Sequence, residues 1–86
     1  MTLAELIIIH RTNLEDESVG IRRSWEETFR YTVKYVSPGI SLKDFDLDNL
    51  AARMACGGIQ KAFIDGYVTR WRFLLECAQV PPDENG

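Results

Sequence analysis

Apolar residues recur at intervals of three and four along most of the chain, which is the spacing that gathers side chains on one face of an α-helix. This pattern predicts four helices, two short and two long, and no convincing strand. The short helices are expected over about residues 3–13 and 47–55. The long helices are expected from near residue 18 or 20 to about residue 36, and over about residues 59–79. The predicted fold class is therefore all-α.

The residues at the predicted helix ends agree with these boundaries. Thr2 and Glu5 have the spacing of a capping box, in which each side chain bonds the backbone amide of the other residue. Asp46 is a typical N-cap for the third helix. Pro38 disfavours helical geometry in the residue before it and so ends the second helix. The two glycines at residues 57–58 end the third helix.

Each long helix is predicted to turn one apolar stripe, which includes a tryptophan, toward the core. In the second helix the stripe consists of Ile21, Trp25, Thr28, Phe29, Thr32 and Val36. In the fourth helix it consists of Phe63, Ile64, Tyr67, Trp71, Leu74, Leu75 and Ala78. An extended connection before the third helix is expected to add Ile40, Leu42 and Phe45.

Composition places the chain among small globular domains. Its 86 residues are enough for one domain, and 45% of them are hydrophobic. No apolar run approaches the roughly 20 residues that cross a membrane, and the N-terminus lacks the features of a signal peptide. We therefore expect a cytoplasmic protein with no membrane partner. Two cysteines and one histidine are too few for a typical zinc site. A disulfide between Cys56 and Cys77 is the alternative, but disulfides are rare in a reducing compartment, so both cysteines are expected to be half-buried free thiols.

The residues that carry chemistry in enzymes are sparse here. His10 is the single histidine and is expected at the surface or at the edge of the core. The segment DFDLDN lacks the glycine of a calcium-binding EF-hand loop, and GGIQK lacks the full phosphate-binding loop pattern. The sequence thus predicts no catalytic residues, no metal site and no cofactor.

The remaining candidate is a charged surface. On the second helix Arg23, Arg30 and Lys34 fall within about 40° of one another, opposite the core stripe, with Glu27 on the same side and Arg22 at the flank. On the fourth helix the residues opposite the core are Lys61, Thr69 and Arg72, and two acids four residues after the cations are placed to pair with them. The net charge of −3 and the pI of about 5.0 argue against an autonomous DNA-binding domain, because phosphate neutralisation favours basic proteins. Tyr31 and Tyr35 are the aromatic residues expected to be free to touch a partner.

The order of the segments resembles a known family. TLAELIIIHRTN, RRSWEETFRYTVKYV, ISLKDFDLDNLAARM and FIDGYVTRWRFLLECA are similar, in this order, to the helices and the connection of the core-binding domain of phage integrases and other tyrosine recombinases. The resemblance covers about residues 2–80 and rests on order and spacing, since each segment is degenerate. Phe63 and Cys77 depart from it, because the family often has a threonine and an aromatic residue there.

The resemblance implies a compact four-helix SAM-like bundle at residues 1–80, followed by a linker or tail at residues 81–86. It implies half of a clamp around double-stranded DNA at a recombination site, for DNA integration or recombination. The catalytic half of the protein would follow on the same chain, so the domain is not expected to be an enzyme by itself. It is expected to be a monomer when isolated and an oligomer on DNA. The residues implied to contact DNA are Arg22, Arg23, Arg30, Lys34, Lys61, Thr69 and Arg72. The alternative is a small helical protein-interaction module with no DNA role.

Overall fold

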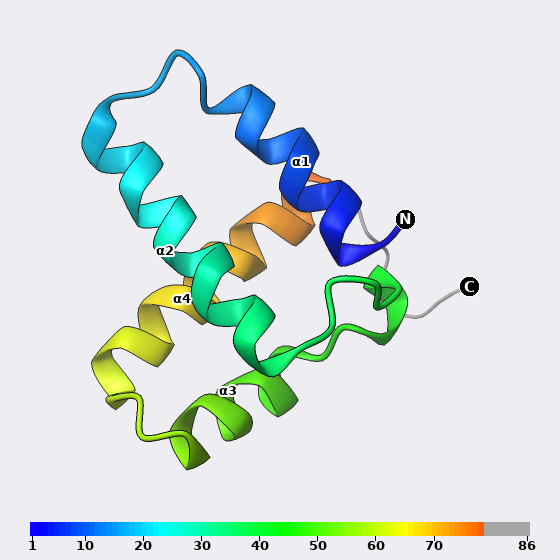
Figure 1. Cartoon of the computed structure of the whole chain (residues 1–86), viewed down its shortest axis with the longest axis vertical. Coiled ribbons are helices and arrows are strands. Elements are labelled where there is room, and N and C mark those ends of the chain that lie inside the picture. The colour runs from blue at the N-terminus through cyan, green and yellow to red at the C-terminus, as the bar shows by residue number, and fades with distance from the viewer. Residues whose placement is uncertain (79–86) are drawn as a thin grey trace.

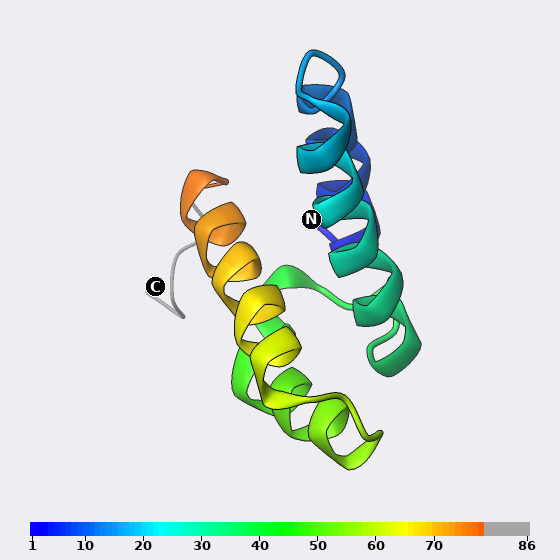
Figure 2. The same cartoon turned by 90° about the vertical axis from the view of Figure 1, so that its left-hand side faces the viewer.

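The computed structural model describes residues 1–78, and these form an all-helical, compact bundle, as predicted. Its α-helices are α1 (Leu3–Asn13), α2 (Val19–Tyr35), α3 (Leu47–Cys56) and α4 (Lys61–Cys77), and a single 3-10 turn, η1 (Leu42–Asp44), precedes α3. Figure 1 shows α1 and α2 as an antiparallel pair joined by the loop at the top, with α4 crossing behind α2. Turned by 90°, the same structure has α1 and α2 on one side and α3 and α4 on the other (Figure 2). The fold is thus two helical hairpins packed on each other.

The helix starts use the predicted caps. The Thr2 amide donates to Glu5 Oε1 at 2.7 Å, and the Glu5 amide donates to Thr2 Oγ1 at 3.2 Å, which completes the capping box. Asp46 Oδ1 accepts from the amide of Asp48 at 2.9 Å and from that of Asn49 at 3.3 Å. Gly58 has φ of +89°, a left-handed conformation that glycine adopts without strain, and it lies in the short link between α3 and α4. The predicted boundaries of α1, α2 and α3 are confirmed to within one or two residues.

The segment after α2 fastens the N-terminus. The amide of Leu3 donates to the carbonyl of Ile40 at 2.9 Å, and the amide of Leu42 donates to the carbonyl of Met1 at 3.0 Å. Leu42 and Phe45 are buried, as the apolar pattern predicted, and Ile40 is half-buried. The segment differs from the prediction in one respect, because residues 42–44 make a 3-10 turn instead of an extended chain.

The core lies where α4 crosses α2, and its largest fully buried side chain is Trp71. The indole Nε1 of Trp71 donates to Thr32 Oγ1 at 2.7 Å, and Thr32 Oγ1 in turn donates to the carbonyl of Thr28 at 2.7 Å. Both threonines are fully buried, so these bonds satisfy groups that would otherwise be costly in an apolar interior. The prediction that each long helix carries a core tryptophan is confirmed, since Trp25 is also buried.

Four side chains lie farther out than predicted. Ile21 and Phe63 are 44% and 54% exposed, although their spacing placed them on the core faces. Each lies in the first turn of its helix, at the edge of the apolar stripe and away from the α2–α4 crossing. Cys56 and Cys77 are free, as expected, but exposed instead of half-buried, because each is the last residue of its helix.

Two further predictions concern membrane spanning and the C-terminal end of the chain. In residues 1–78 none of the helices combines the length and the apolar character needed to cross a membrane. The predicted last residue of the fourth helix and the predicted linker or tail at residues 81–86 lie outside the described residues.

Candidate nucleic-acid interface

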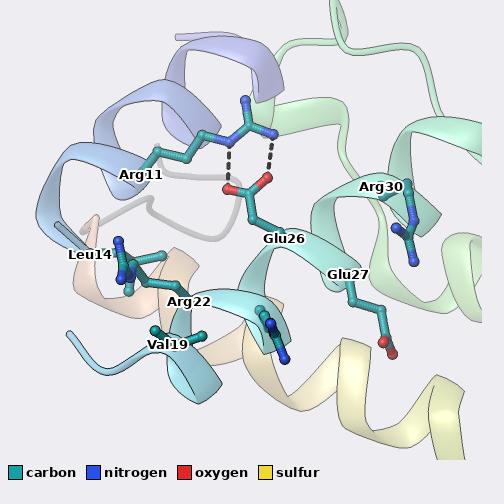
Figure 3. Close-up of a pocket in the computed structure, with 8 residues that line it drawn as sticks. Arg11, Leu14, Val19, Arg22, Glu26, Glu27 and Arg30 are labelled. Atoms are coloured by element: carbon teal, nitrogen blue, oxygen red, sulfur yellow. Dashed lines mark hydrogen bonds and ion pairs between the residues drawn. The ribbon is translucent and has the colours of Figure 1, made fainter.

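The outer side of α2 carries the largest collection of cations in the described chain. Arg22, Arg23, Arg30 and Lys34 are all exposed, and we call these four residues the basic face of α2. Three of them line a hollow of about 560 Å3 that also reaches the end of α1 (Figure 3). Within residues 1–78, none of the four has a carboxylate oxygen within ion-pair distance, so their charge is available to a ligand.

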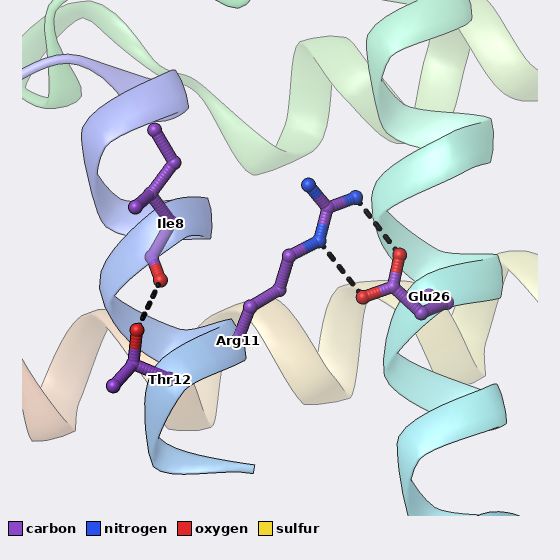
Figure 4. A network of polar contacts seen from close by, with 4 residues as sticks. All are labelled: Ile8, Arg11, Thr12 and Glu26. Atoms are coloured by element: carbon purple, nitrogen blue, oxygen red, sulfur yellow. Dashed lines mark hydrogen bonds and ion pairs between the residues drawn. The ribbon is translucent and has the colours of Figure 1, made fainter. Parts of the chain in front are cut away.

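Arg11 of α1 joins this surface, although sequence reasoning did not identify it. Its Nε and Nη2 donate to the two carboxylate oxygens of Glu26, both at 2.8 Å, in the parallel geometry seen in Figure 4. Its guanidinium also lies 5.6 Å from the centre of the Phe29 ring. The two partners of the ion pair are about half exposed and fifteen residues apart, and only the turn between α1 and α2 brings them together. No short-range spacing in the sequence indicates such a pair.

The two carboxylates on this side are both engaged. Glu26 holds Arg11, and Glu27 Oε2 accepts a hydrogen bond from the Tyr67 hydroxyl at 2.7 Å. Figure 3 shows Glu27 directed toward α4 and away from Arg11. Counted with Arg11, the surface holds five cations and two carboxylates, a formal charge of +3 on a chain whose net charge is −3. The acidic composition therefore does not describe this face.

The predicted site residues of α4 lie elsewhere. Toward α2, the α4 helix presents Tyr67, Arg70 and Trp71, which donate hydrogen bonds to Glu27, Thr28 and Thr32. At 100° per residue, Lys61, Thr69 and Arg72 lie about 120–160° around the helix from that contact, and all three are exposed. The basic face of α2 lies beside the same contact, since Arg30 and Lys34 lie over the Tyr31 ring, which stacks on Tyr67 of α4. The structure thus brings together Arg22, Arg23, Arg30 and Lys34, and places Lys61, Thr69 and Arg72 on a different side.

The charges on α4 are also partly neutralised. Lys61 Nζ lies 2.7 Å from Asp65 Oδ2, which confirms the predicted pairing at four residues' distance. The second predicted pair is not formed, since in the described chain Arg72 and Glu76 make no ion pair. Arg70 is used internally, because its Nη1 donates to Thr28 Oγ1 at 3.1 Å. Among residues 1–78, Arg72 is thus the one cation on the outer side of α4 without an ion-pair partner.

The two tyrosines expected to be free are instead part of the packing. The Tyr31 and Tyr67 rings are stacked, with centres 5.6 Å apart and planes 17° from parallel. Arg30 and Lys34 lie 5.4 Å and 4.6 Å from the centre of the Tyr31 ring, within cation–π distance. Burial, reinforced by the hydrogen bond to Glu27, raises the pKa of the Tyr67 hydroxyl, which stays protonated as a donor.

Tyr35 is similarly constrained at the other end of α2. It is half-buried against the link between α3 and α4, where a side chain at Gly57 would collide with its ring. The glycine therefore serves close packing between α2 and the end of α3.

His10 is a boundary residue, as predicted. Its ring stands edge-on to Trp25, with centres 4.3 Å apart, and within residues 1–78 its buried Nε2 has no hydrogen-bond partner. Burial lowers the pKa of this imidazole, because desolvation disfavours the charged form. The described residues contain no group of three histidine, cysteine, aspartate or glutamate side chains arranged to hold a metal ion.

Comparisons with protein-family models, with curated proteins and with solved structures find no match for this chain. The resemblance to the core-binding domain of tyrosine recombinases, and the domain boundaries drawn from it, therefore stay predictions from the order of the segments. The surface described above is the observation on which a functional proposal has to be built.

Proposed function

We propose that this domain binds double-stranded DNA through the basic face of α2, and that it serves as the DNA-binding domain of a phage-integrase-type tyrosine recombinase. The main support for DNA binding is the group of four cations on α2, which have no carboxylate partner in the described chain and lie next to the paired Arg11. Phosphate neutralisation with release of counterions is the main source of such affinity.

The geometry of the helix fits a phosphate backbone. Arg23 and Lys34 are eleven residues apart, which corresponds to about 16 Å along the helix, or roughly five base pairs of duplex. Arg30 lies between them on the same side. Contacts of this kind position a protein on DNA without reading its sequence. We therefore expect the isolated domain to bind weakly, with little sequence preference and a strong dependence on salt.

The recombinase context supplies a role for weak binding. If the domain is half of a clamp, the catalytic half on the full-length chain shares the affinity, and this half needs only one basic face. The domain would then position DNA and perform no chemistry by itself. This part of the proposal is supported by the order of the sequence segments, while DNA binding is supported by the surface of α2.

A titration of labelled duplex DNA, followed by fluorescence anisotropy at several salt concentrations, tests the proposal. The double variant R23A/R30A is expected to bind at least tenfold more weakly and to reduce the salt slope by about two, one unit for each lost phosphate contact. The matched control is K61A/R72A, which removes the same number of cations from the outer side of α4. Loss of binding in the control alone would place the interface on α4, and unchanged binding by R23A/R30A would refute the site on α2.

A second candidate is a protein-interaction module without a DNA role, and one feature favours it. An apolar groove of about 470 Å3 runs between α1, α2 and the end of α4, and it includes the exposed side chains of Ile9, Ile21 and Phe73. Under this alternative, the parent and R23A/R30A would be equally inert toward duplex DNA at about 50 mM salt, a condition that favours phosphate binding.

A further inference from the structure

A second hollow adjoins the basic face of α2 and has a different chemical character. It has a volume of about 370 Å3, lies between α2 and the start of α4, and is lined chiefly by Tyr31, Tyr67, Phe63, Glu27 and Gln60. This volume falls within the range of about 300–1,000 Å3 that is typical of small-molecule sites. Three aromatic rings therefore line one small depression at the edge of the cationic surface.

Phe63 is the unusual member of this group. Its side chain is 54% exposed, and among the described residues it has no aromatic partner, whereas Tyr31 and Tyr67 stack on each other. Phe73, ten residues later on the same helix, is equally exposed at 56%, but its ring lies against Trp25. Phe63 thus presents an unstacked ring at the wall of the hollow.

The polar groups at the hollow retain hydrogen-bonding capacity. Glu27 uses Oε2 to accept from the Tyr67 hydroxyl, and within residues 1–78 its other carboxylate oxygen has no partner. Gln60 occupies the N-cap position of α4, but its side chain makes no capping hydrogen bond. A carboxylate oxygen and a side-chain amide together supply the acceptors and donors that the edges of nucleobases require.

The cations stand beside the same rings. Arg30 and Lys34 both lie over Tyr31, which also lines the hollow, and both lack a carboxylate partner within the described residues. A planar group in the hollow would therefore have two positive charges next to it. This combination of stacking surface, edge hydrogen bonds and adjacent cations is the chemistry of binding to single-stranded nucleic acid.

We propose that the hollow holds one unpaired nucleobase of a nucleic-acid strand, stacked against Phe63, while the neighbouring phosphates lie on Arg30 and Lys34. This inference rests on the proposed function, because it uses the same basic face. It adds a preference that phosphate contacts alone do not give: a single strand, or a duplex with an unpaired base, binds more tightly than a fully paired duplex. Removal of one stacking aromatic side chain reduces affinity by about 5- to 150-fold in comparable sites.

The experiment compares F63A with F73A, two exposed phenylalanines of one helix, on a labelled single strand and on the duplex of the same sequence. F63A is expected to bind the single strand about 5- to 150-fold more weakly and to change duplex affinity by less than about twofold. F73A is expected to leave both affinities unchanged, and F63W, which keeps a stacking ring, is expected to restore single-strand binding.

The outcomes separate the two proposals. If F63A binds the single strand as well as the parent, or if F73A loses as much as F63A, the nucleobase site is refuted while a weakened R23A/R30A variant still supports duplex binding. If the parent binds neither form in a salt-dependent manner, the proposed function fails and the nucleobase site fails with it. A folded F63A variant is expected because this side chain is exposed, and its circular dichroism spectrum checks that expectation.

Discussion

The two long helices invite comparison because α2 and α4 each have seventeen residues, a buried tryptophan and cations on the side opposite the core. They differ in how those cations are used. On α2 the cations are unpaired and are joined by Arg11 from a neighbouring helix, whereas on α4 Lys61 is paired with Asp65 and Arg70 bonds Thr28. The number of basic residues on a helix therefore does not define an interface. Pairing, and convergence with a neighbouring element, decide which charges remain for a ligand.

The largest expected effects concern the two tryptophans. Trp71→Ala should lower the free energy of unfolding by about 4–5 kcal/mol, because the ring is fully buried and its loss also leaves Thr32 without the indole donor. Trp25→Ala should cost about 3 kcal/mol, the lower end of the range for such truncations, since this ring lies at the edge of the core. Urea denaturation followed by circular dichroism measures both. If Trp25→Ala lowered the free energy of unfolding as much as Trp71→Ala or more, the central position of Trp71 in the core would be contradicted.

A smaller effect isolates the buried hydrogen bond between the two helices. Thr32→Val keeps the shape of the side chain but removes the acceptor for Trp71 Nε1, which should cost about 1–3 kcal/mol. Thr69→Val on the exposed side of α4 is the matched control and should stay within about 0.5 kcal/mol of the parent. Equal unfolding midpoints for the two variants would contradict the buried bond as a link between α2 and α4.

Replacing one acidic residue on each long helix tests whether ion pairing limits the cations that are available to DNA. Glu26→Gln removes a negative charge from the basic surface and weakens the hold on Arg11, so duplex affinity at about 50 mM salt should rise roughly two- to fivefold. Asp65→Asn releases Lys61 on the outer side of α4 and should leave that affinity unchanged. Anisotropy titrations measure the duplex affinity of both variants. Equal changes in affinity would contradict the proposed difference between the cations of α2 and those of α4.

The smallest expected effect is a pH dependence of the free energy of unfolding. It arises from His10 of α1, whose ring packs against Trp25 of α2. Burial lowers the pKa of His10 in the folded state, so the unfolded chain takes up a proton first as the pH falls below the ordinary value of about 6.5. The stability that the neutral imidazole contributes is therefore present above that value and declines as the pH falls toward the lower pKa of the folded state. The stability difference between the parent and His10→Gln should shift in this direction between about pH 7 and 5. A difference that is constant with pH would mean that His10 is not desolvated.

Local features of the fold were predictable from the sequence because they depend on residues close together in the chain. The capping box of Thr2 and Glu5, the N-cap at Asp46 and the positions of both tryptophans follow from spacings of three and four residues. The candidate site was predictable only in part. A helical wheel orients each set of cations relative to the core side of its own helix, but it does not relate the outer side of α2 to that of α4.

The features that were missed are those created by tertiary contacts. Arg11 reaches the basic surface because α1 folds back along α2, and Tyr31 is covered because Tyr67 of α4 stacks on it. Phe63 has the spacing of a core residue but lies in a first turn, where the neighbouring helix no longer covers it. Sequence periodicity records which side of a helix is apolar, and it does not record how far the neighbouring helix extends.

The bonds that fasten the N-terminus have a consequence for the order in which the chain opens. Because Leu3 bonds Ile40 and Leu42 bonds Met1, the first helical hairpin is closed into a ring by its own ends. The amide hydrogens of Leu3 and Leu42 are therefore expected to exchange together, when this ring opens. Hydrogen-exchange protection of the Leu3 and Leu42 amides then measures the free energy of opening the α1–α2 ring. Comparison with the protection of the α4 amides shows which of the two parts opens more readily.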